Sequence, residues 1–341
     1  MSTINGKSVR DILTGTQNAD TIHGNGGDDT IDGRGGNDYL YGDAGNDGVY
    51  GGSGNDRLWG GTGIDALFGQ DGADQLYGEA GDDYLDGGAG NDFLHGGSGN
   101  DRLRGGDGND TLNGSSGSND LAGGNGDDTL IHYGRVADGL PAGTARYDGG
   151  AGRDTLLVDV QGELLTPAGD GLAYLRIEIG RDGKGGISQV TNPDEPEIFP
   201  IGSISGIETF KLSSVDNVFD FSARSTITAY GGSGGDRLEG MEGDQTFIGG
   251  AGADSYRFLW REGWDGGHDK VIGFNKAEGD YIAYSNQFES DNGPDPLLIS
   301  AVEKAGHTIY TATEIATGQV VHTLDVDAIG LPPPIIGYYL G

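Results

Sequence analysis

An aliphatic residue recurs at every ninth position from Ile22 to Leu130, and residues of varied polarity flank each one. Three successive nonapeptides, counted from Gly51, read GGSGNDRLW, GGTGIDALF and GQDGADQLY. All fit GGxGxDxUx, in which U is a large aliphatic residue, and thirteen such words fill Gly15–Ile131 without an insertion. Because the aliphatic residue lies between two variable ones, the last three places of each word predict a very short strand with one side chain directed inward.

Glycines mark the first, second and fourth places of the word, where they permit positive φ angles that other residues adopt only at a cost. The first six places therefore predict a tight turn. Turns stacked on one another predict parallel sheets around a narrow column of Leu and Ile. The word at Gly6–Thr14 keeps Asp11 and Leu13 in phase but lacks the inner glycines, so it predicts an N-terminal cap.

The sixth place is aspartate in every word of this stretch except one, which has Asn119. Between Gly15 and Ile131 the net charge is −18, from 21 Asp and 1 Glu against 4 Arg and no Lys. Stacked Asp rows at a strand spacing of roughly 4.8 Å would repel one another, and so thin an aliphatic column does not offset the entropy lost on ordering the turns. A disordered, solvated linker is the alternative, but it does not account for the strict aliphatic place.

A hard divalent cation would remove this repulsion and add ligand bonds. Calcium fits better than magnesium, because Ca²⁺ accepts about six to eight oxygen ligands in a loose geometry whereas Mg²⁺ requires a tighter octahedron.

On these residues the chain resembles the RTX (repeats-in-toxin) family of secreted calcium-binding proteins, whose nonapeptide repeat forms a parallel β-helix. The resemblance covers Gly6–Ile131 and returns at Gly149–Leu157 and Gly231–Arg257. It implies an all-β fold, a right-handed parallel β-roll in which two words make one coil and the loops alternate between two edges. Each ion would lie between loops i and i+2, bound by both sixth-place carboxylates and by carbonyls of the first four loop residues. The implied metal ligands are Asp20, Asp29, Asp38, Asp47, Asp56, Asp65, Asp74, Asp83, Asp92, Asp101, Asp110, Asp128, Asp154, Asp236 and Asp254.

Two words depart from the pattern, and each predicts a weak or empty site. The word with Asn119 reads GSSGSNDLA, which places Asp120 one residue late. In the second array Gln245 occupies the aspartate place, although Asp236 and Asp254 are one full coil apart and predict an ion between them. The first array would then bind up to about eleven ions, whose charge would roughly neutralise it.

The remaining composition restricts the partners and the route of export. The net charge of −34 argues against nucleic acid and anionic membrane surfaces as partners. The chain has no Cys, no visible signal peptide and no apolar run long enough to span a membrane. The family resemblance implies secretion by a type I ABC exporter of a Gram-negative bacterium, with an uncleaved C-terminal signal. The chain would travel unfolded at low cytosolic calcium and fold outside the cell.

Four segments follow from the repeat boundaries. Residues 1–157 predict an N-terminal roll with its cap and an insertion at 132–148, and residues 158–230 a non-repetitive β-rich region. Residues 231–285 predict a second short roll with a closing segment, in which Phe274 and Ile282 cap the aliphatic column. Residues 286–341 predict a β region with strand-like runs at LLISAVEKA, HTIYTATE and QVVHTLDV, and carry the export signal that the resemblance implies.

The ninth place is aromatic in five successive words, at Tyr41, Tyr50, Trp59, Phe68 and Tyr77. Because alternate words share a sheet, Tyr41, Trp59 and Tyr77 predict one outward ladder, and Tyr50 with Phe68 another. Such ladders could stack sugar rings of an extracellular polysaccharide or mediate self-association. We favour the simpler interpretation that they shield short strands and stabilise their cross-strand neighbours.

No catalytic constellation is visible. The histidines form no HExxH motif, and GGSGG, which places Ser233 in a formal GxSxG match, lies within a repeat word. We therefore expect a secreted, non-enzymatic matrix, surface or interaction protein that folds on binding calcium. Two alternatives are an accessory module of an extracellular epimerase, lipase or protease, and a secreted effector that contacts host cells. A glycan site hidden in residues 158–229 also stays open.

Overall fold

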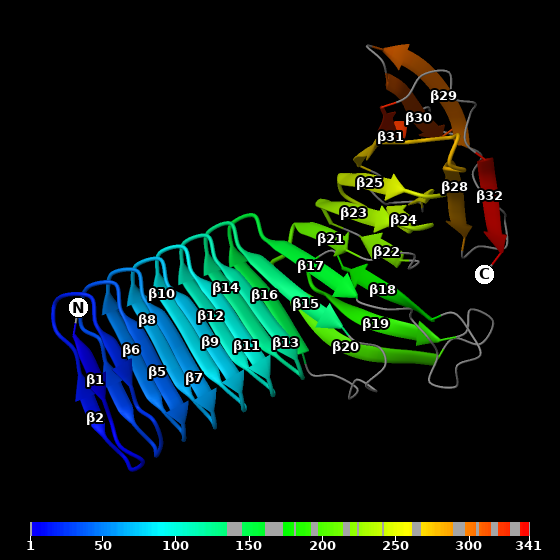
Figure 1. The fold of residues 1–341 in the computed structure, drawn as a ribbon. Helices are drawn as coiled ribbons and strands as arrows, with labels where there is room; N and C mark the ends of the chain where they lie inside the picture. The colour runs from blue at the N-terminus through cyan, green and yellow to red at the C-terminus, as the bar shows by residue number, and fades with distance from the viewer. Residues whose placement is uncertain are drawn as a thin grey trace. The chain divides into compact units, whose positions relative to one another are not determined.

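The computed structural model describes residues 2–134, 145–160, 173–180, 182–191, 197–213, 219–223, 225–240, 242–260, 267–288, 297–304, 307–314, 320–327 and 335–340. Every regular element in these ranges is a β-strand (Figure 1). The chain divides into two compact units. Unit 1 comprises Met1–Asp159 with Ile201–Ile207, and unit 2 comprises Val160–Pro200 with Glu208–Gly341. The four segments inferred from the sequence remain a prediction.

Unit 1 is a parallel β-solenoid made of two sheets, as the repeat predicts (Figure 1). Odd-numbered strands form one sheet, the odd sheet, and even-numbered strands form the other, the even sheet. The odd sheet contains β1 (Thr3–Asn5), β3 (Thr21–His23), β5 (Tyr39–Ala44), β7 (Arg57–Thr62), β9 (Gln75–Ala80), β11 (Phe93–Ser98), β13 (Thr111–Ser116), β15 (Thr129–Gly134) and β17 (Thr155–Val160). The even sheet contains β2 (Ile12–Thr14), β4 (Thr30–Asp32), β6 (Gly48–Ser53), β8 (Ala66–Asp71), β10 (Tyr84–Ala89), β12 (Arg102–Asp107), β14 (Asp120–Asn125), β16 (Ala145–Ala151) and residues of β20 (Glu197–Ser205).

The strand register shows that two words make one coil. Each strand pairs in parallel with the strand of the second word along, so that Leu40 lies opposite Leu58, and Leu58 opposite Leu76. The cap word joins this pattern, because Leu13 of β2 lies opposite Ile31 of β4. All thirteen aliphatic residues of the eighth place, from Ile22 to Leu130, have no solvent-exposed surface. They form the core of unit 1.

The strands are longer than the sequence predicted. From β5 onward a strand typically has six residues, from the seventh place of one word to the third place of the next. The turn then occupies places four to six. The predicted three-residue strand is found at β1 to β4. The error arose because the second-place glycine was taken as a turn residue, whereas the parallel ladder continues through it, as Gly61 opposite Glu79 shows.

Glycine is required at the three places of the word for different reasons. This corrects the expectation that all three have positive φ. Positive φ occurs at the second and fourth places, for example at Gly61 (109°) and Gly63 (135°). First-place glycines are not among the residues with positive φ. A Cβ at Gly42 would lie 2.6 Å from Asp47 Oδ2 and 2.5 Å from the Gly60 carbonyl oxygen, so the first place requires the absence of a side chain.

One buried polar pair lies where the repeat is interrupted. His132 occupies a first place in β15, and its Nδ1 is 2.5 Å from the hydroxyl of buried Tyr147 in β16. Burial lowers the pKa of His132 to about 4, so the ring is neutral at physiological pH. Residues 135–144 of the predicted insertion lie outside the described residues.

Unit 2 combines parallel strands with antiparallel hairpins. In one sheet β21 (Thr209–Ser213), β23 (Ile227–Ser233), β25 (Gln245–Ala251), β27 (His268–Ile272) and β31 (Val320–Val326) are parallel, and β30 (His307–Glu314) and β29 (Leu297–Lys304) add antiparallel pairs. The other contains β19 (Gly185–Thr191), β18 (Ala173–Ile179), β22 (Phe219–Ala223), β24 (Arg237–Gly240), β26 (Ser255–Trp260), β28 (Tyr281–Phe288) and β32 (Ile335–Leu340). The three strand-like runs of the tail are β29, β30 and β31. Ile282 lies opposite Tyr256 in the buried column, and Phe274 is half-buried with its ring 6.1 Å from that of Tyr256.

Candidate metal sites

The sixth-place aspartates of unit 1 are buried at the end of each turn, just before the next strand begins. From Asp20 to Asp128 none is more than 3% exposed. From Asp29 onward, the Oδ1 atom of each accepts the backbone N–H of the aspartate 18 residues earlier. For example, Asp38 Oδ1 accepts from Asp20 at 2.7 Å and Asp56 Oδ1 from Asp38 at 2.8 Å. These bonds form one ladder along each edge of the roll.

The second carboxylate oxygen is different. In the described residues Oδ2 is buried and has no hydrogen-bond partner at Asp29, Asp38, Asp47, Asp56, Asp65, Asp74, Asp83, Asp92, Asp101, Asp110, Asp128 and Asp254. A buried carboxylate oxygen without a partner is costly, because its hydration is lost without replacement. Each of these words therefore presents a buried acceptor without a protein donor.

The surroundings of Oδ2 supply further oxygen. At Gly51, a Cβ would meet Asp56 Oδ2 at 2.5 Å and the Gly69 carbonyl oxygen at 2.7 Å. The carboxylate oxygen and the carbonyl of the next coil on the same edge thus converge beside a first-place glycine. Oxygen-only donors of this kind suit Ca²⁺, which takes carboxylate and backbone carbonyl ligands together.

Burial perturbs these carboxyl groups strongly. It raises the pKa of Asp65, Asp74, Asp101 and Asp128 to about 7, and that of Asp38 to about 6, because the charged form loses hydration. The N–H bond to Oδ1 opposes this shift, and neighbouring carboxylates add to it. Bound cations would instead lower the pKa of these carboxyl groups, since they favour the ionised form.

The fit to calcium depends on backbone carbonyls. In the described parts of the chain no group of three or more His, Cys, Asp or Glu side chains is placed to hold a metal ion. Two carboxylates per gap are what the repeat offers, so the remaining ligands must be carbonyl oxygens. Such a donor set suits calcium better than transition metals, which prefer His and Cys. The individual ligand assignments remain predictions.

Asp20 at the start of the roll differs from the rest. Ser2 donates its N–H to Asp20 Oδ1 at 2.9 Å, and its hydroxyl also contacts this oxygen at 2.5 Å. Thr16 donates its N–H and hydroxyl to Oδ2 at 2.6 and 2.8 Å. These donors, with the Ser2 hydroxyl first, hold the pKa of Asp20 well below its usual value. Its carboxylate is therefore satisfied without a cation.

Asn119 preserves the ladder but changes its chemistry. Its Oδ1 accepts the Asp101 N–H at 2.8 Å, as an aspartate would. A Cβ at Gly114 would meet Asn119 Nδ2 at 2.5 Å, so an amide donor lies where other words place Oδ2. This geometry supports the prediction of a weak or empty site.

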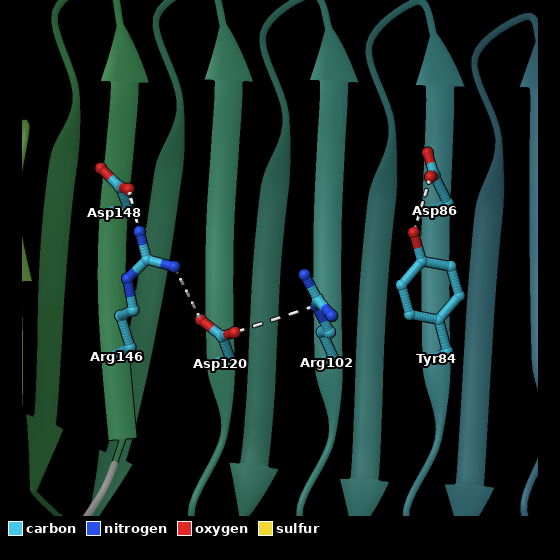
Figure 2. A network of polar contacts seen from close by, with 6 residues as sticks. All are labelled: Tyr84, Asp86, Arg102, Asp120, Arg146 and Asp148. Atoms are coloured by element: carbon cyan, nitrogen blue, oxygen red, sulfur yellow. Dashed lines mark hydrogen bonds and ion pairs between the residues drawn. The ribbon is translucent and has the colours of Figure 1, made fainter.

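The late aspartate of that word lies on the outer face of the even sheet. Asp120 contacts Arg102 Nε at 3.8 Å and Arg146 Nη1 at 3.7 Å, and Arg146 also contacts Asp148 at 2.5 Å (Figure 2). These pairs are partly exposed and contribute little to stability. Asp120 consequently takes no part in the buried ladder.

The ladder extends further than the sequence analysis predicted. In unit 1 Asp154 Oδ1 accepts the Asp128 N–H at 2.9 Å across the interruption, and in unit 2 a separate ladder is present in which Asp254 Oδ1 accepts from Asp236 at 2.9 Å. Two buried aspartates that were missed continue it. Asp280 Oδ1 accepts the Asp254 N–H at 2.9 Å, and Asp269 Oδ1 accepts the N–H of Gln245 at 2.8 Å. Their sequence signal is the Asp-x-aliphatic triplet, DKV and DYI, in words that lack glycine at the first two places.

A second ladder on the outside of the turns was also missed. Fifth-place Asn and Asp side chains accept the N–H of the residue 18 positions later. Asp28 Oδ1 accepts from Asn46 at 2.9 Å, and Asn46 Oδ1 from Ile64 at 2.7 Å. Ile64 is 62% exposed and offers no side-chain acceptor, so this ladder is interrupted there.

The aromatic ladders form as predicted. On the odd sheet the ring of Tyr41 stacks on Trp59 at 4.6 Å, and Trp59 on Tyr77 at 5.6 Å, with His23 stacked on Tyr41 at 4.3 Å. On the even sheet Tyr50 and Phe68 stack at 5.0 Å. The rings lie within 10° of parallel, so each inner ring is covered on both faces by its neighbours. This supports cross-strand stabilisation and leaves little ring face for a sugar.

Comparison with known proteins identifies the repeats. A family model described as the RTX calcium-binding nonapeptide repeat (4 copies) matches residues 5–40, 28–58, 59–94, 95–130 and 230–257. No curated protein matches the chain significantly. Among the described residues no helix could cross a membrane.

Proposed function

From the premise that this chain carries RTX calcium-binding nonapeptide repeats of the hemolysin type in multiple copies, we propose that it is a secreted protein whose roll folds on binding extracellular calcium. Outside the cell it would act as a non-enzymatic matrix, surface or interaction component. RTX repeats are typical of proteins that leave the cell by the type I route, which supports the proposed location.

The observation that carries this proposal is the row of buried, unpartnered Oδ2 atoms along both edges of unit 1. From Asp29 to Asp110 each coil places one such atom on each edge, beside backbone carbonyl oxygens. Without cations, burial and then repulsion between neighbouring carboxylates raise the pKa values of these groups, and their ionisation at neutral pH opposes the folded state. Bound calcium supplies positive charge and ligand bonds between successive coils.

Export and folding then depend on the same balance. At low cytosolic calcium the carboxylates keep the chain extended, which suits threading through an exporter. In the higher calcium outside the cell, binding to the folded state stabilises it by mass action. The absence of cysteine is compatible with this route, since no disulfide has to form after passage.

The test is a Ca²⁺ titration of the full chain, followed by far-UV circular dichroism and isothermal calorimetry, with Mg²⁺ as the matched ion. We expect a cooperative gain of strand signal at roughly millimolar or lower Ca²⁺, several ions bound per chain, and no comparable response to Mg²⁺. A full strand signal in excess EGTA, or no response to calcium, would contradict the proposal.

A further inference from the structure

The two outer faces of unit 1 differ in the number of charged side chains at their seventh and ninth places. On the odd sheet the outward seventh and ninth places run from Thr3 in β1 to Leu157 in β17, all within the described part of the chain. Arg57 is the one charged residue among them. The same places of the even sheet, from β2 to β16, contain four carboxylates and three arginines. They are Asp32, Asp86, Arg102, Arg104, Asp120, Arg146 and Asp148, and several of them pair in Figure 2.

The absence of carboxylates from the seventh and ninth places of this face is unexpected in a chain with a net charge of −34. The single guanidinium is also satisfied within the face. Arg57 Nη1 donates to the Tyr39 hydroxyl at 2.6 Å, and its Nε donates to Gln75 Oε1 at 3.1 Å. Asp43 and Glu79 lie at the turn ends of their strands, and His23 Nδ1 is 3.5 Å from Asp43 Oδ2. The middle of the odd sheet is therefore aromatic and poor in charge, with Arg57 bonded within the face, as the centres of protein interfaces tend to be.

The geometry of the aromatic side chains indicates what covers this face. Sugar rings bind to free aromatic faces, but here the inner rings are covered by one another. What they present outward is a row of ring edges and hydroxyl groups, repeating at the strand spacing of about 4.8 Å. A surface with the same repeat is the odd sheet of a second copy, whose rows can fit between these rows along their whole length.

We propose that the odd sheet of unit 1 is the interface of a homodimer, in which the same face of two calcium-loaded rolls packs together. Nine strands at about 4.8 Å and a strand length of about 20 Å give an area on the order of 800 Å² per copy. That is the usual size of a stable interface. Because both copies use the same patch, the assembly closes as a two-fold dimer.

This inference rests on the proposed function only in requiring the folded, calcium-loaded roll. The full chain in saturating Ca²⁺ is examined by sedimentation equilibrium, with circular dichroism of each variant as a separate readout of folding. We expect a reversible dimer for the natural sequence. The double variant Trp59→Ser and Tyr77→Ser should weaken association at least about tenfold. Its matched control, Tyr50→Ser and Phe68→Ser on the even sheet, should leave the dimer unchanged.

A second pair of variants leaves the aromatic stacks unchanged. Thr111→Glu adds a carboxylate to the odd face in β13, and Ala122→Glu adds one to the even face in β14. The first should prevent dimerisation with no change in the calcium-induced strand signal, and the second should not. A calcium-loaded monomer at all concentrations would overturn the proposal, as would equal effects of both glutamates. Open-ended oligomers, or association that requires added dextran, would also overturn it, the latter in favour of a glycan partner.

Discussion

The two units solve the problem of a stable core in different ways. In unit 1 most strands contribute one aliphatic side chain to the core, and most neighbouring turns add a buried carboxylate. In unit 2 the largest buried side chains are aromatic, namely Phe210, Phe247, Tyr256, Phe258 and Tyr310. A buried aromatic ring removes far more apolar surface from water than a Leu does. The stability of unit 2 therefore depends more on apolar packing, and that of unit 1 more on cations that neutralise its carboxylates.

Calcium removal should separate the units most clearly. In excess EGTA we expect amide hydrogens of β5 to β13 to lose nearly all protection from exchange, since their carboxylates are then uncompensated. Amides of β25, β26 and β30 should retain more, because Phe247, Phe258 and Tyr310 stay buried there. Hydrogen-exchange mass spectrometry of the full chain measures both at once. Equal loss in the two units would show that the aromatic core does not act independently of calcium.

Exchanging aspartate and asparagine should change the ladder by one site at a time. Asp74→Asn keeps an Oδ1 acceptor for Asp56 N–H but replaces the unpartnered oxygen by an amide, as Asn119 does. We expect it to lower the number of bound Ca²⁺ by about one or two and to raise the calcium midpoint of folding.

The reverse change, Asn119→Asp, should raise the number of bound ions by a similar amount. Calorimetric titration reports both variants against the natural sequence. If Asp74→Asn bound calcium with unchanged stoichiometry, the sixth-place carboxylate would not be a ligand.

The pH dependence should have opposite signs with and without calcium. The pKa values of Asp65 and Asp74 are raised from about 4 to about 7 in the calcium-free fold. Their protonation therefore favours that fold below pH 4, and this contribution is lost as the pH rises through 7. In EGTA, residual strand signal should be greater near pH 5 than near pH 8. When calcium is added, the calcium concentration at the midpoint of folding should rise on acidification, because protons compete with Ca²⁺ for the same carboxylate oxygens. Dichroism titrations at the two pH values provide the measurement.

The smallest expected effect concerns the outer ladder of unit 1. Ile64→Asn would supply an Oδ1 acceptor for the N–H of Asp82, as Asn46 does for Ile64, and would remove an exposed apolar side chain. We expect stabilisation of about 0.5–1.5 kcal/mol, measured by urea unfolding in saturating calcium. Ile64→Ser shortens the side chain at the same position and serves as the control. Equal stability of the two variants would argue against the hydrogen bond.

Sequence predicted the repeat architecture well, because each place of the word has one dominant physical requirement. The inward column from Ile22 to Leu130, the two-word coil and the aromatic stacks all follow from strict phase. Strand length was not predicted, because a second-place glycine such as Gly61 has positive φ, as a turn residue does, and yet pairs within the parallel ladder. Asp269 and Asp280 were missed because the first two places of their words are not glycine. The role of a first-place glycine such as Gly42 depends on crowding by Asp47 and Gly60, which the linear pattern does not show.

Near-identical coils create an ambiguity in folding. If the chain of unit 1 slipped by 18 residues, the inner aliphatic column and the aspartate ladder would still align, so a misthreaded roll would lose little of either. Only the irregular words distinguish one coil from the next. A chain wound with a slipped register would lose the interactions of these irregular words. They are the stack of Trp59 between two tyrosines, Asn119 in the aspartate ladder, and the contact of His132 with Tyr147.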